Sequence, residues 1–163
     1  MSLVMDDQQR WRLELQDSDA GVRATAAENL CLAGSESVAA AVDLVMACGD
    51  VEDVQNWAAA ALEDLGVPPV DSVNSLEPLV NSSAPLVGYW AATLLGRLGA
   101  SASCSQVTLG KAVSESPHLS VQERAAWALG KIGATEVSVV ESLKKAAASS
   151  SPRLASLATR ALA

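Results

Sequence analysis

The sequence predicts an all-α solenoid in which five helix pairs stack side by side as one elongated domain of 163 residues. The first observation is a thirteen-residue pattern that recurs along the chain. Its copies begin at Val22, Val54, Val87, Val121 and Leu154. Successive copies start 32, 33, 34 and 33 residues apart, and this period is typical of stacked helical pairs. The second observation is composition: 50% of the residues are hydrophobic but only 3% are aromatic, so the helices must pack through small and aliphatic side chains.

The repeated pattern indicates how each copy packs and where it ends. Because positions 1, 5, 9 and 12 fall on one stripe of a helix, we expect them to form the core. The fifth position is always alanine and the ninth always leucine, at Ala26, Ala58, Ala91, Ala125 and Ala158, and at Leu30, Leu62, Leu95, Leu129 and Leu162. A glycine follows the last apolar residue of each of the first four copies and predicts a left-handed cap at the helix end. These glycines are Gly34, Gly66, Gly99 and Gly133.

The other helices are predicted between the repeated ones. They run over residues 4–16, from 35 or 37 to 48, from 71 to a kink or stop at Pro78, over 106–115 and from 135 to about 147. Short polar side chains accept hydrogen bonds from free backbone N–H groups at helix starts. The expected caps are Asp17 or Asp19, Asp50, Asp71, Ser120 with Glu123 as a capping box, and Thr135. The alternative to the capping box is that Ser116 and Pro117 start the same helix a turn earlier. Pro85 and Pro152 are expected in first turns, where proline is tolerated.

The helix pairs set approximate repeat boundaries within a single predicted domain, residues 1–163. The repeats are expected at residues 3–34, 35–66, 67–99, 100–133 and 134–163. The clearest break lies at Pro68 and Pro69, because two prolines cannot extend the preceding helix. The last helix stops at Ala163 while still apolar. This leaves two interpretations open: self-association through the C-terminal helix, or a fragment of a longer repeat protein.

Charge and hydropathy exclude several classes of function. The formal net charge of −8 and the pI near 4.5 argue against nucleic acid as a partner, since proteins that bind it cluster lysine and arginine. The longest apolar segment, residues 37–48, is interrupted by Asp43 and is too short to cross a bilayer. The N-terminus lacks the pattern of a signal peptide. We therefore expect a soluble cytoplasmic protein that binds neither nucleic acid nor membrane.

Cysteine and histidine content does not indicate a metal site or a cofactor. Cys31, Cys48 and Cys104 are widely spaced in apolar helical patterns, which favours reduced, buried thiols. His118 is the single histidine of the chain, and it has no acidic or cysteine neighbour at ligand spacing. The serine-rich loops lack a base and are explained by helix capping. We expect no metal, no cofactor and no catalytic residue.

The first and fourth copies resemble the HEAT-like repeat of the phycobilisome-lyase type, whose form is roughly D-x-D-x-x-V-R-x-x-A-A-x-A-L-G-x-I-G. The matching residues are Asp17, Asp19, Val22, Arg23, Ala26, Ala27 and Leu30 at its start, and Ala125, Ala126, Ala128, Leu129, Gly130, Ile132 and Gly133 at its end. The resemblance covers about nine-tenths of the chain. It implies a right-handed α-α superhelix of five HEAT-like helix pairs, with the Val22-type helices on the concave face. The arginine after the valine is kept only at Arg23, so the ladder from arginine to loop aspartate that the family implies is interrupted.

Proteins with similar repeats include scaffolds, bilin-attachment enzymes and a di-iron hydroxylase. The hydroxylase depends on several His–Glu pairs as iron ligands, and a chain with His118 as its one histidine lacks them. The resemblance therefore leaves scaffolding and a bilin lyase-like or chromophore-handling subunit as the two functions to consider.

Positions 3, 7 and 10 of the pattern lie opposite the core stripe and predict a surface for a partner. Tyr89 and Trp127 occupy adjacent repeats, where their rings could lie side by side, as aromatic residues do in binding surfaces. The candidate binding residues are Tyr89, Thr93, Glu123, Trp127, Asn56 and Glu63. The alternative is that either ring fills a gap over a neighbouring glycine or alanine. Glu28, Glu63 and Glu123 similarly form either an acidic groove for a basic peptide or an ordinary solvated face.

The predicted function is a non-catalytic scaffolding module that presents its concave face to another protein or peptide. In the lyase alternative, a tetrapyrrole would lie against Tyr89 and Trp127.

Trp57 and Trp90 share the fourth position of the pattern and are expected in the core between repeats.

Overall fold

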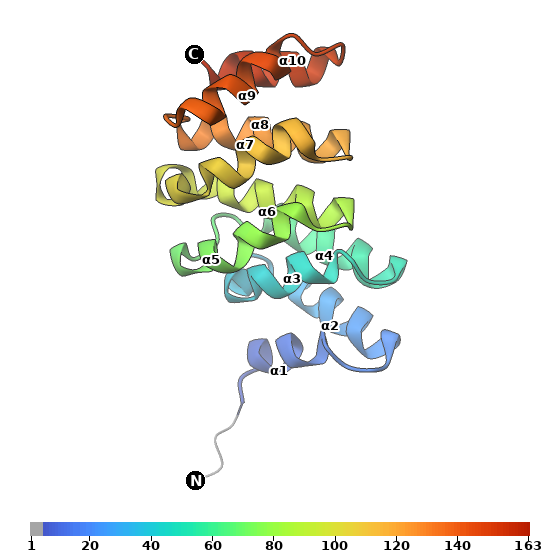
Figure 1. The fold of residues 1–163 in the computed structure, drawn as a ribbon. Coiled ribbons are helices and arrows are strands. Elements are labelled where there is room, and N and C mark those ends of the chain that lie inside the picture. The colour runs from blue at the N-terminus through green and yellow to red at the C-terminus, as the bar shows by residue number, and fades with distance from the viewer. Residues whose placement is uncertain (1–4) are drawn as a thin grey trace. The chain divides into compact units, whose positions relative to one another are not determined.

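The computed structural model describes residues 5–163, which form α-helices and short 3₁₀-helices and no strand (Figure 1). The helices divide into two compact units, one ending at Pro69 and one starting at Val70. This division follows Pro68 and Pro69, where the sequence predicts a break. The predicted starts of the first repeat and the first helix, at residues 3 and 4, lie outside the described residues.

The first unit contains two helix pairs. Its elements are α1 (Asp7–Glu14), α2 (Ala20–Leu32), η1 (Gly34–Ala40), α3 (Ala41–Ala47) and α4 (Glu52–Asp64). α2 packs against α1 and α4, so the two helices with the repeated pattern lie side by side. The helix predicted to start at residue 35 or 37 begins as the 3₁₀-helix η1. Within it the buried hydroxyl of Ser37 donates a hydrogen bond to the carbonyl of Leu30, which ties this turn to α2.

The second unit contains three helix pairs. Its elements are η2 (Val70–Ser72), α5 (Val73–Leu76), η3 (Glu77–Asn81), α6 (Pro85–Leu98), η4 (Gly99–Ser105), α7 (Gln106–Glu115), α8 (Leu119–Ile132), α9 (Val137–Ala147) and α10 (Pro152–Ala161). α8 packs against α6, α7 and α10. α7 has the predicted bounds. As predicted, α5 ends just before Pro78, because proline removes a backbone hydrogen bond and clashes with the preceding turn.

Alanine and leucine of the repeated pattern form the core, as predicted. The fully buried members are Ala26, Ala58, Ala91, Ala125, Ala158, Leu30, Leu62, Leu95 and Leu129. Val22 and Leu162 are each 36% exposed and differ from the prediction. Each belongs to a terminal repeat, which has a neighbour on one side only. Trp90 is buried as predicted, whereas the prediction for Trp57 was wrong, because that residue is 37% exposed.

The helix ends follow the predicted glycines. Gly34, Gly66, Gly99 and Gly133 have φ values of +59°, +84°, +58° and +88°. Residues with a β-carbon rarely adopt this left-handed region, so glycine is what allows the chain to turn there.

The helix starts agree only in part with the predicted caps. The carboxylate of Asp19 caps α2, accepting a hydrogen bond from the Gly21 amide at 2.7 Å. Ser120 lies inside α8, which begins one residue earlier, so the predicted capping box is wrong. Thr135 does not cap α9 either. Its amide and the next one donate to the side-chain oxygen of Gln106, 2.9 Å from each, so a side chain from α7 supplies the acceptor.

The three cysteines are free thiols, but they are not all buried. Cys48 is buried, Cys31 is half-buried and Cys104 is exposed, so the prediction of burial was wrong for Cys104. Across residues 5–163, none of the helices combines the length and the apolar composition that a membrane span requires.

Candidate functional site

Tyr89 and Trp127 line the same pocket of the second unit. In this unit α8 lies between α6 and α10 (Figure 1). α6 and α8 come close because Gly96 has no side chain. A β-carbon on Gly96 would overlap the Trp127 ring and lie 3.0 Å from Cα of Ala128. One face of the Trp127 ring therefore covers a glycine, as the gap-filling alternative predicts, while the side chain stays half-exposed.

Two adjoining pockets lie on either side of Trp127 and Leu157, and each has a volume of about 180 Å³. The first is lined by Tyr89, Ser120, Glu123, Arg124, Trp127, Arg153 and Leu157. The second is lined by Ala126, Trp127, Gly130, Lys131, Leu157, Arg160 and Ala161. α8 contributes residues to both pockets, and so does α10. We call the surface that holds both pockets the α6/α8/α10 face.

Arg124 connects the two aromatic residues. The central carbon of its guanidinium lies 4.5 Å from the centroid of the Tyr89 ring and 5.0 Å from that of the Trp127 ring. Its Nη2 also donates a hydrogen bond to the Tyr89 hydroxyl. Tyr89 in turn meets the buried Trp90 edge to face, with the ring centroids 5.5 Å apart. These contacts hold the guanidinium in place by cation–π attraction and a hydrogen bond.

Glu123 is held in an ion pair on the same face. Its carboxylate lies 3.3 Å from Nε of Arg153, which comes from α10, and the carboxylate is more buried than the arginine. The predicted acidic groove therefore does not form at this residue, because an arginine neutralises it and a second, Arg124, stands next to it.

The other predicted site residues have different surroundings. Thr93 is only 4% exposed, and its hydroxyl donates to the Tyr89 carbonyl at 2.7 Å. The prediction that Thr93 faces a partner was therefore wrong. Its hydroxyl instead satisfies a backbone acceptor inside α6. Asn56 and Glu63 are exposed on α4 of the first unit, and their part in binding stays a prediction.

Sequence reasoning missed Arg124, Arg153 and Leu157. Arg124 occupies the fourth position of the pattern. This position was predicted to be core because Trp57 and Trp90 occupy it in other copies. The available signal was charge: α6, α8 and α10 contain several lysine and arginine residues but Glu123 as their one carboxylate.

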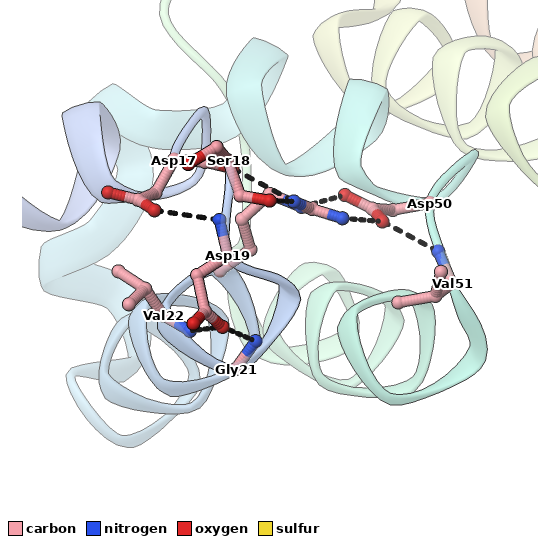
Figure 2. A network of polar contacts seen from close by, with 8 residues as sticks. Asp17, Ser18, Asp19, Gly21, Val22, Asp50 and Val51 are labelled. Atoms are coloured by element: carbon pink, nitrogen blue, oxygen red, sulfur yellow. Dashed lines mark hydrogen bonds and ion pairs between the residues drawn. The ribbon is translucent and has the colours of Figure 1, made fainter.

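A separate polar network joins two loops of the first unit (Figure 2). Arg23 donates from Nε and Nη2 to the two carboxylate oxygens of Asp50, at 2.7 and 2.8 Å. Its Nη1 donates to the carbonyls of Asp17 and Ser18, at 2.8 and 3.2 Å. The hydrogen bond from Arg23 lowers the pKa of Asp50, and the Val51 amide lowers it further. Because each polar group in this network has a partner, we assign it a structural role.

Glutamine takes over part of this role in later repeats. Gln55 and Gln122 stand where Arg23 stands in the first copy. Their amide groups donate to the carbonyls of Cys48 at 2.8 Å and Ser116 at 2.9 Å, in the loops that precede their own helices. Glutamine has no charge and fewer N–H donors than arginine. Each glutamine therefore bonds the loop before its own helix but does not pair with an aspartate of the next loop, as Arg23 does.

Two pockets of the first unit are lined by other residues. One measures about 340 Å³ and is lined by Met5, Gln9, Arg12, Leu13, Gln16 and Asp43. Its charged groups, Arg12 and Asp43, are paired at 2.7 Å. The part of the chain that the structure describes holds no cluster of His, Cys, Asp and Glu that suits a metal ion.

Comparison with protein families shows one match. Residues 74–163 match the family described as HEAT repeats, which is more than half of the chain. A comparison with curated proteins found no match.

Solved structures of similar fold include engineered proteins. Two from the Northeast Structural Genomics Consortium have TM-scores of 0.63 and 0.64 and sequence identities of 21% and 18%. Each match covers 96% of this chain, and 78% and 80% of the other. A designed armadillo repeat protein in complex with the peptide (KR)4 has a TM-score of 0.62 and a sequence identity of 16%. That match covers 93% of this chain and 79% of the designed protein. These likenesses show the all-α repeat fold.

Proposed function

Because this chain belongs to the HEAT-repeat family, we propose that it is a non-catalytic interaction module that binds an extended segment of another protein on the α6/α8/α10 face. The repeat fold supports binding of this kind, since stacked helices present long surfaces. The designed armadillo protein of similar fold was solved with a peptide bound.

The cluster of Tyr89, Arg124 and Trp127 is the observation that carries the proposal. These are the three residue types that contribute most often to the binding energy of protein interfaces. All three are half-buried, and they come from neighbouring repeats. Arg124 is already held against both rings, so its side chain would lose little conformational entropy when a partner binds.

The polar groups of the first pocket suit binding better than group transfer. The Tyr89 hydroxyl accepts a hydrogen bond from Arg124, and Glu123 is paired with Arg153. Ser120 is the hydroxyl nucleophile that lines the pocket, but the lining contains no histidine or lysine to act as its base.

A lyase-like subunit of the phycobilisome-lyase type remains the second candidate. It would hold a tetrapyrrole between Tyr89 and Trp127, where an extended aromatic molecule finds two rings. Each pocket alone, at about 180 Å³, is below the roughly 300 Å³ at which small-molecule sites begin, so a tetrapyrrole would have to extend across both. Adding bilin to the purified protein separates the two: the lyase candidate predicts a shift of the bilin absorption band, and the interaction module predicts an unchanged spectrum.

Selection from a display library of random twelve-residue peptides tests the proposed function. We expect the native protein to select peptides, and Trp127→Ala to weaken their binding about tenfold or more, the loss of roughly 1.4 kcal/mol. The matched control is Trp57→Ala, which removes an exposed tryptophan from α4. A second variant, Tyr89→Phe, keeps the ring but loses the hydroxyl that Arg124 contacts. Selected peptides that bind native protein and Trp127→Ala equally well would contradict the proposal, provided that circular dichroism shows both to be folded.

A further inference from the structure

The charge of the α6/α8/α10 face is opposite to that of the chain. The chain has a net charge of −8, whereas these three helices carry five cationic residues and one carboxylate, a net charge of +4. The five are Arg97, Arg124, Lys131, Arg153 and Arg160. Most of the acidic residues belong to the other unit. Residues 1–69 contain thirteen carboxylates and three arginines, whereas residues 70–163 contain six carboxylates and eight lysines and arginines.

Four of these cationic residues line the two pockets beside Trp127. Arg124 and Arg153 line the first pocket, and Lys131 and Arg160 line the second. Nζ of Lys131 lies 5.8 Å from the centroid of the Trp127 ring, on which Arg124 also packs. A ligand lying across both pockets would thus meet apolar surface in the middle and positive charge on each side.

Much of this charge is not neutralised within the protein. Glu123, the one carboxylate of the three helices, is paired with Arg153. Within residues 5–163, Arg124, Lys131 and Arg160 form no ion pair with a carboxylate. Their mutual repulsion is a cost of folding that a bound anion would relieve.

We infer that the α6/α8/α10 face binds an acidic peptide segment, in which aspartate or glutamate side chains alternate with apolar ones. This inference rests on the proposed function and names the chemistry of its partner. Carboxylates would accept hydrogen bonds from Arg124 and from Lys131 and Arg160, and an apolar side chain would pack on Trp127 and Leu157. A short acidic segment fits better than a long polyanion, because the unpaired cationic groups lie within two adjoining pockets.

Fluorescence anisotropy with three blocked, labelled octapeptides tests the inference. The probes are (DL)4, (KL)4 and (SL)4, which share apolar residues and differ in charge. We expect (DL)4 to bind at least about tenfold more tightly than either of the others, with an affinity that falls as salt is raised. Equal binding of (DL)4 and (SL)4, both lost in Trp127→Ala, would overturn the inference and leave the proposed function standing. If none of the probes binds and display also selects no peptide that depends on Trp127, both fail.

Paired charge variants separate the face from the overall charge of the protein. The double variant Lys131→Gln with Arg160→Gln removes two cations from the face. Its control, Lys144→Gln with Lys145→Gln, removes two exposed cations from α9 in the same unit. We expect the first pair to weaken (DL)4 binding at least about tenfold and the second less than about twofold. Equal losses in the two double variants would overturn the inference.

Two further measurements test other occupants of the face. Sedimentation equilibrium of the protein alone shows whether its mass depends on Lys131 and Arg160, in which case the occupant is a second copy and the inference is wrong. A labelled thymidine octanucleotide tests nucleic acid. If it binds more tightly than (DL)4 and loses affinity in the same double variant, the face binds phosphate and the inference is also overturned.

Discussion

Arg23 and Asp50 form a two-pronged ion pair that joins the loop before α2 to the loop before α4. The same arginine also holds the carbonyls of its own loop. One side chain therefore ties together the loops at the starts of α2 and α4.

The Arg23–Asp50 pair should make stability depend on pH in the acid range. The hydrogen bond from Arg23 lowers the folded-state pKa of Asp50 below its ordinary value of 3.8. The stabilisation is therefore fully present above that value and is lost as the pH falls through the folded pKa. We expect Arg23→Gln to have a lower melting temperature than native protein at pH 7, and the two melting temperatures to converge as the pH falls through the folded-state pKa of Asp50. Arg10→Gln, which breaks an exposed ion pair inside α1, is the control. A difference that persists unchanged at low pH would show that the pair is not its cause.

Leucine at the ninth position should dominate the stability of the second unit. Leu95→Ala and Leu129→Ala should each lower the free energy of unfolding by about 2–5 kcal/mol, because both side chains are fully buried and leave cavities. Leu32→Ala, at a position that is 75% exposed, should change it by less than about 0.5 kcal/mol. Urea denaturation measures all three, and losses of equal size at Leu32 and Leu129 would contradict the core assignment.

Two glycines of the second unit should respond to alanine in opposite ways. Gly96→Ala forces the Trp127 ring and the α8 backbone away from α6, and should cost about 1–3 kcal/mol. Gly130→Ala places its β-carbon no closer than 3.5 Å to its neighbours. This substitution should leave the free energy of unfolding unchanged or raise it by up to about 1 kcal/mol, because alanine favours the helix more than glycine does. Thermal melts of both variants check this. A stable Gly96→Ala protein would mean that α6 and α8 are not in close contact.

Gln106 should be needed for the start of α9. Gln106→Met keeps the shape of the side chain but removes the acceptor for two backbone amides, and should cost about 1–3 kcal/mol. Lys111→Met, on the exposed side of the same helix, provides the control. Amide hydrogen exchange at Thr135 and Glu136 should accelerate in the first variant alone, and protection that stays as in native protein would refute this role.

The cysteines should react with thiol reagents in order of exposure. Cys104 is exposed and should react first with an aromatic disulfide reagent at pH 8. Cys48 should react only after unfolding, because burial raises its pKa to about 12 and the thiolate is the reacting form. Cys104→Ser should remove the fast phase of the reaction. A fast phase that survives this substitution would show that Cys31 or Cys48 is accessible.

The structure brings together only some of the residues predicted to form the binding site. Tyr89, Glu123 and Trp127 line one pocket, but Thr93 is buried, and Arg124 occupies a position that the pattern had assigned to the core. Residues at one wheel position differ in burial because the exposed part of a helix depends on its neighbours. For Trp57 and Trp90 the same position gives an exposed ring and a buried one. A helical wheel describes a single helix, so it does not include the neighbouring helices that decide which of its residues are buried.

The sequence by itself determined the repeat, the buried alanines and leucines, and the glycines at the helix ends. These follow from short-range rules, since spacing selects the face of a helix and a positive φ selects glycine. Only the tertiary structure decided that Arg124 lies against Tyr89 and Trp127, that Arg153 neutralises Glu123, and that Gln106 supplies the acceptor at the start of α9. The contacts of Arg124 with Tyr89, of Arg153 with Glu123 and of Gln106 with the Thr135 amide each join groups about thirty residues apart. Their geometry therefore depends on how closely two helices pack rather than on local sequence.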